Sequence, residues 1–161
     1  MTPDIRELQE KKLVGKHLRM TMAANRTFEL WSSFMPRRWE INHRINSDML
    51  SVQVYDADHD PSTFNADAAF DKWAAVEVST DDQVPEGMST FTLPAGSYAV
   101  FQYKGLPSEG DKVFGYIFGT WLPPSDYVLD HRPHFEVLGP KYKNNSPDSE
   151  EEIWIPVKRK E

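Results

Sequence analysis

Apolar and polar residues alternate over much of the chain, which is the pattern of half-buried β-strands. The alternation is clearest at residues 91–105, where Tyr98 and Val100 fall on one face and Ala99 and Phe101 on the other. Similar stretches predict further strands at residues 12–22, 50–58, 70–78, 127–139 and 151–158. The chain is therefore predicted to be rich in antiparallel sheet.

Two segments change to the helical period. In residues 25–41, the apolar residues Phe28, Trp31 and Phe34 recur at helical spacing, and Pro36 is expected to end or bend the helix. The second helix is predicted from positions at i, i+3, i+4, i+7 and i+8, which are Phe114, Ile117, Phe118, Trp121 and Leu122. Strands and helices together predict the α+β class.

The order strand, helix, strand, strand occurs twice. The helices end in FMP at 34–36 and WLP at 121–123, and SVQVY at 51–55 precedes HFEVL at 134–138 by a similar offset. These echoes predict one domain, residues 1–161, built from duplicated β-α-β-β modules at about 12–80 and 91–158 with pseudo-two-fold symmetry. A ligand cleft is expected where the modules meet.

The alignment of the two modules gives Glu136 the place of Gln53, so that a polar side chain occurs at the same point of both strands. Tyr55 lies two residues after Gln53 and shares its face. A solvent-exposed strand glutamate is the alternative for Glu136. The repeated polar position favours a place at the seam.

Composition excludes several classes of function. A net charge of −7 without a basic face argues against nucleic acid as a direct partner. The absence of cysteine excludes disulfides, thiolate nucleophiles and Cys-ligated zinc, and HRPH at 131–134 offers two histidines without a third ligand. We predict no cofactor and no metal. No apolar run suits a membrane span or leader, so no membrane partner and a cytoplasmic location are expected.

Five stretches together resemble the GyrI-like small-molecule-binding domain, which is also the effector-binding domain of some AraC-type and MerR-type bacterial regulators. They are LVGKHLRMTM, LWSSFMPR, TLPAGSYAVFQYKG, TWLPPSDYVLDHRPHFEVLG and EEIWIPVK, within about residues 12–158. The resemblance implies a duplicated fold with an aromatic pocket, a buried glutamate at Glu136, and a second acid among Glu150, Glu151 and Glu152. No helix-turn-helix precedes the domain, so a stand-alone form without DNA binding is expected.

A buried carboxylate in an aromatic pocket has two uses. Ionised, it attracts a hydrophobic cation or planar drug-like effector, with Tyr55, Tyr98, Trp121 and Trp154 as expected walls. Core packing is the alternative role for each tryptophan. Partly protonated, Glu136 could act as a general base, with Tyr55 assisting, in a hydrolase of cyclopropane-bearing xenobiotics, an activity that the resemblance also brings in. A regulator or DNA gyrase as protein partner rests on the family name alone.

Overall fold

A computed structural model describes residues 2–60 and 66–161, with no side-chain description for residue 111. The strands are β1 (Asp4–Leu8), β2 (Lys11–Met20), β3 (Met49–Tyr55), β4 (Phe70–Val78), β5 (Ser89–Leu93), β6 (Gly96–Lys104), β7 (Tyr127–Leu129), β8 (His134–Leu138) and β9 (Glu150–Arg159). The helical elements are α1 (Thr27–Phe34), η1 (Met35–Glu40), η2 (Pro107–Glu109), α2 (Gly110–Tyr116) and the π-helical turn η3 (Ile117–Trp121). The predicted α+β class is confirmed.

The long strand predicted at 91–105 is in fact two strands, β5 and β6. Pro94 carries no backbone N–H and interrupts the pairing, and Gly96 follows with φ of 152°, which a side chain rarely tolerates. The break lets β5 pair with β2 while β6 pairs with β1 and β9. The second helix, predicted from apolar positions that begin at Phe114, starts earlier in the structure, at Gly110.

The sheet has the strand order β1-β6-β9-β8-β3-β4-β2-β5, and β7 pairs with β9. Every strand pair that the described residues form is antiparallel. The two halves of this order correspond as mirror images about its centre: β8 corresponds to β3, β9 to β4, β6 to β2 and β1 to β5. That is the order a duplicated module would produce, and the duplication itself stays a prediction.

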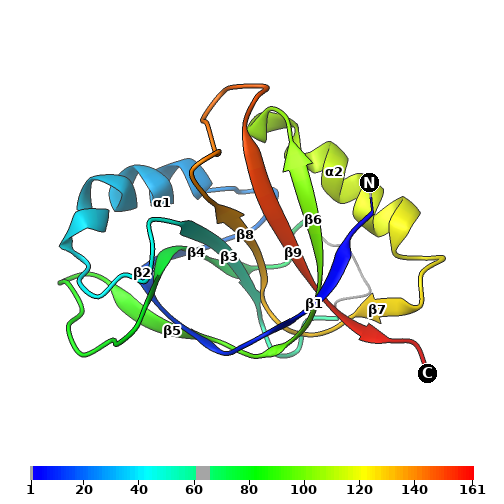
Figure 1. Cartoon of the computed structure of the whole chain (residues 1–161), viewed down its shortest axis with the longest axis horizontal. Coiled ribbons are helices and arrows are strands. Elements are labelled where there is room, and N and C mark those ends of the chain that lie inside the picture. The colour runs from blue at the N-terminus through cyan, green and yellow to red at the C-terminus, as the bar shows by residue number, and fades with distance from the viewer. Residues whose placement is uncertain (1, 61–65) are drawn as a thin grey trace.

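Both helices cover the same face of the sheet, at opposite ends, with β8 between them (Figure 1). Leu30 and Phe34 of α1 pack on a cluster from β2 and β4 that includes Val76. Val113 of α2 and Ile117 belong to a second cluster with β6 and β9. Each fully buried side chain of this size contributes about 1.5–3 kcal/mol of transfer free energy. The helices are thus fixed over the outer strands, and the central strands between them form the floor of the site.

The other face of the sheet buries a third cluster that contains Trp73, Tyr98 and Phe135. Tyr98 lies opposite Pro156, and Phe135 lies opposite Trp154, so the four side chains share this face. Because side chains alternate along a strand, Glu136 points to the helix side. The sheet therefore separates Glu136 from Tyr98.

Candidate ligand-binding site

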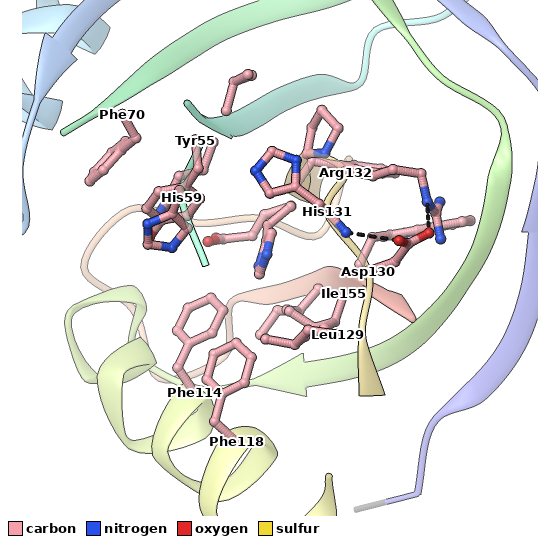
Figure 2. Close-up of a pocket in the computed structure, with 18 of the residues that line it drawn as sticks. Tyr55, His59, Phe70, Phe114, Phe118, Leu129, Asp130, His131, Arg132 and Ile155 are labelled. Carbon is pink, nitrogen blue, oxygen red and sulfur yellow. Dashed lines mark hydrogen bonds and ion pairs between the residues drawn. The ribbon is translucent and has the colours of Figure 1, made fainter. Parts of the chain in front are cut away.

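A cavity of about 1450 Å³ lies against the central strands β3, β8 and β9 and is closed on one side by α2. Phe114 of α2 and Phe118 of the following turn η3 project into this cavity, across from Tyr55 and His59 (Figure 2). The two phenylalanines lie nearly parallel, with ring centres 6.2 Å apart. A hollow of this size with an apolar and aromatic lining is typical of small-molecule sites.

The polar floor of the cavity follows from strand register. Ser51 on β3 lies opposite Glu136 on β8, and Gln53 lies between His134 on β8 and Lys72 on β4. Residues that face one another across antiparallel strands share a face, and so do residues two apart on one strand. The register therefore brings one carboxylate, one imidazole and one ammonium together under the helices.

An aromatic shelf closes one end of the floor. The ring of Tyr55 stacks on His59 at 4.3 Å and an interplanar angle of 13°, and it also contacts Phe70 and His134. The Gln53 side-chain amide donates a hydrogen bond of 2.5 Å to the Tyr55 hydroxyl. Burial raises the pKa of the Tyr55 phenol, so it remains neutral at physiological pH. This shelf offers a flat surface to a planar group.

A second carboxyl group lies beside Glu136. Glu151 on β9 is 9% exposed, and it is two residues from Ile153, the register partner of Glu136. Burial, reinforced by the adjacent Glu136, raises the pKa of Glu151 to about 8, and Lys72 offsets part of the rise. Burial, reinforced by Glu151 and Glu136, raises the pKa of the Tyr142 phenol. At neutral pH Glu151 therefore retains its proton.

The basic groups of the cavity are less positive than their number implies. Burial, with help from Lys72, His59 and His131, lowers the pKa of His134 to about 4, so its imidazole is neutral at pH 7. The His131 Nε2 atom lies 2.8 Å from the carbonyl oxygen of Asp56, which ties the segment before β8 to the end of β3. Of the described lysines that line the cavity, Lys72 lies at the floor, and Lys158 and Lys160 lie elsewhere on the wall.

Arg132 forms part of the wall and is largely neutralised by its surroundings. Its guanidinium pairs with Asp130 at 2.9 Å, donates to the carbonyls of Ser97 and Val157, and lies 4.7 Å over the Tyr98 ring. Its buried Nη1 has no hydrogen-bond partner among the residues that the structure describes. Because these contacts join β6, β9 and the segment before β8, we assign Arg132 to the framework of the cavity.

Three of the residues expected at the site line the cavity: Glu136, Tyr55 and Trp154. Trp154 stacks on Phe135 at 5.1 Å, and its indole N–H donates to Glu152 at 3.2 Å. Since its register partner is Phe135, it belongs to the sheet face opposite Glu136 and reaches the cavity from there.

The structure places the other two expected wall residues in packing positions. Tyr98 is fully buried, and its hydroxyl donates to the carbonyl of Pro133 at 2.9 Å. Trp121 in η3 packs edge-on against Phe101 at 5.2 Å and beside Tyr127.

Several lining residues did not stand out in the sequence. Phe114 and Phe118 lie four apart on the predicted helix, which was a usable signal, but their spacing equally fits a core stripe. Lys72 had no distinguishing signal in a half-buried strand. Among Glu150, Glu151 and Glu152, only Glu151 is buried, and strand alternation would identify it once the buried face is known.

Within residues 2–60 and 66–161, no group of three His, Asp or Glu side chains is arranged to hold a metal ion. In the same part of the chain, no helix has the length and apolar character needed to cross a membrane.

The chain belongs to the family of GyrI-like small molecule binding domains, because the family's sequence model matches residues 1–158. It is 28% identical over 136 residues to the transcriptional regulator BrlR of Pseudomonas aeruginosa, across 80% of this chain and 45% of BrlR. It is 34% identical over 92 residues to a DNA gyrase inhibitor of Erwinia billingiae, across 53% of this chain and 57% of that protein. The chain thus spans about half the length of the curated relatives it matches.

Solved structures share the fold. An integron cassette protein of Vibrio cholerae matches with a TM-score of 0.70 at 18% identity, over 98% of this chain and 96% of that one. The protein SAV2435, solved bound to tetraphenylphosphonium, matches with a TM-score of 0.67 at 18% identity, over 98% of this chain and 94% of that one. The predicted family membership is confirmed, and the domain is one that binds small molecules.

Proposed function

We propose that this protein binds hydrophobic cations, planar ones included, in the cavity beneath α2, and thereby senses or sequesters drug-like compounds or an effector. Glu136 is the electrostatic anchor, Phe114 and Phe118 cover the ligand, and Tyr55 contributes an aromatic wall, while Trp154 lines the hollow from the other face of the sheet. The observation that carries the proposal is the charge at the floor: the half-buried carboxyl group of Glu136 lines a cavity of about 1450 Å³ and lies beside the buried carboxyl group of Glu151. Aromatic faces and a fixed negative charge both favour a cation that is poorly hydrated.

The neighbour bound to tetraphenylphosphonium supports this ligand class, because a protein of the same fold binds a bulky lipophilic cation. The neutral His134 supports it as well, since a charged imidazole at that position would repel the ligand.

A titration with tetraphenylphosphonium tests the proposal through the fluorescence of the 5 tryptophans. We expect saturable binding that Glu136→Gln weakens at least tenfold, because one buried charge pair is worth roughly 1.5 kcal/mol or more. Glu150→Gln is the matched control, with the same change of charge in a neighbouring residue outside the cavity lining. Equal affinity in wild type and Glu136→Gln would sink the proposal.

The second candidate is hydrolysis of a cyclopropane-bearing alkylator. Water would add across the strained carbon–carbon bond, with Glu136 taking a proton from the water and the ring carbon receiving one from a neutral acid. Burial raises the pKa of the Tyr55 phenol, which keeps it protonated but makes it a weaker proton donor. In addition, Tyr55 is four residues along β3 from Ser51, the partner of Glu136, which places the two about 13 Å apart along the strand. That spacing favours a ligand that lies between them over joint activation of one water, so binding is the better-supported function.

A further inference from the structure

The two carboxyl groups at the floor differ in their access to the cavity. Glu136 lines it, whereas Glu151 is 9% exposed and lies diagonally behind Glu136 on the next strand. A ligand that contacts Glu136 therefore changes the electrostatic environment of Glu151 without touching it.

The groups that face Glu151 come from each element around it. Glu136 approaches from β8, Tyr142 from the segment after β8, and Lys72 from β4. From β6, Tyr103 is the direct register partner, and its hydroxyl donates to the carbonyl of Leu106. Lys72 is thus the positive group among them, and one fixed ammonium does not fully neutralise two carboxylates that are held together.

Resting on the proposed function, we propose that a cation bound at Glu136 displaces the proton of Glu151, so that the cavity exchanges a proton for a lipophilic cation. The proton leaves to solvent, and both carboxylates then face one ligand charge and the ammonium of Lys72. Because proton loss from Glu151 and cation binding are linked, conditions that remove the proton raise the affinity for the cation. The protein should therefore bind permanent cations more tightly as the pH rises. A neutral ligand of the same shape gains nothing from this exchange.

The coupling follows from the geometry of the pair. Like charges held together oppose the second ionisation, and a ligand cation in the same low-dielectric space removes part of that opposition. A change of about one unit in the pKa of Glu151 on binding corresponds to an affinity gain of about sixfold from pH 6.5 to 8.5, with about 0.4 proton released per ligand at pH 8.

Isothermal titration calorimetry measures both quantities on the full chain. Tetraphenylphosphonium is the probe, because its charge does not titrate, and triphenylphosphine oxide is the neutral control. Repeating the titration at pH 8 in two buffers of different ionisation enthalpy gives the number of protons released by the wild type directly. Glu151→Gln is expected to bind the cation with an affinity independent of pH, while Glu150→Gln retains the rise.

The outcomes separate this inference from the proposed function. Cation binding that depends on Glu136, with pH-dependent affinity and proton release that vanish in Glu151→Gln, supports the exchange. Cation binding that is flat with pH and releases no proton overturns the exchange and leaves the proposed function standing. A pH dependence that persists in Glu151→Gln also overturns it, because another group is then responsible. Absence of cation binding overturns both.

Discussion

Replacing Glu151 with glutamine should stabilise the protein at alkaline pH and have little effect in acid. The pKa of Glu151 is raised from about 4.5 in the unfolded chain to about 8 in the fold. The folded state therefore binds the proton more strongly, so the related stability is fully present below pH 4.5 and is lost as the pH rises to 8. Glu151 is 9% exposed, so solvent screens its carboxyl group only weakly.

The size of this stability change follows from the difference between the unfolded and folded pKa values of Glu151. Each unit of difference between the unfolded and folded pKa corresponds to about 1.36 kcal/mol of unfolding free energy. At pH 7.5 nearly the whole interval between these two pKa values lies below the pH. The wild type then carries a penalty on the order of 4 kcal/mol relative to a neutral side chain at this position. Glutamine keeps a polar group of the same size and removes the charge.

Urea unfolding, followed by tryptophan fluorescence at pH 4.5, 6, 7 and 8, measures the effect. The decisive quantity is the difference in unfolding free energy between Glu151→Gln and wild type, because other titrations cancel in it. We expect this difference to grow steadily with pH, and to stay flat for Glu150→Gln. A Glu151→Gln difference that is the same at pH 4.5 and pH 8 would refute a shared proton at the pair.

Three further predictions concern the same framework. His134, with a pKa lowered to about 4, opposes protonation, so the wild type should lose about 3 kcal/mol as the pH falls from 6.5 to 4, and His134→Gln should remove most of that loss in acid unfolding curves. Lys72→Gln should bind tetraphenylphosphonium roughly fivefold more tightly, because a competing positive charge leaves the cavity; unchanged affinity would place the ligand elsewhere. Gly96→Ala should cost about 1–3 kcal/mol in chemical unfolding, since its Cβ would lie 2.3 Å from Nη1 of Arg132. Arg132→Ala should then lower the free energy of unfolding less in the Gly96→Ala variant than in the wild type. Strictly additive effects of the two substitutions would contradict the predicted clash.

Local patterns in the sequence determined the elements and much of the floor. Alternation identified most strands, helical spacing identified both helices, and the comparison of HFEVL with SVQVY brought Glu136 and Gln53 to one seam. These features depend on residues within a few positions of one another, where the period of a strand or helix fixes the side-chain direction.

Tertiary pairing decided what local patterns could not. Tyr98 and Trp154 became neighbours of Phe135 on the face away from Glu136 because β6, β9 and β8 pair in one register. The same register selected Glu151 from three consecutive glutamates and buried it behind Glu136. Alternation along a strand divides side chains between two faces, but which face is buried, and against what, depends on partners far along the chain. The neighbouring charged groups of the cavity could therefore be identified only from the strand pairing of the tertiary structure.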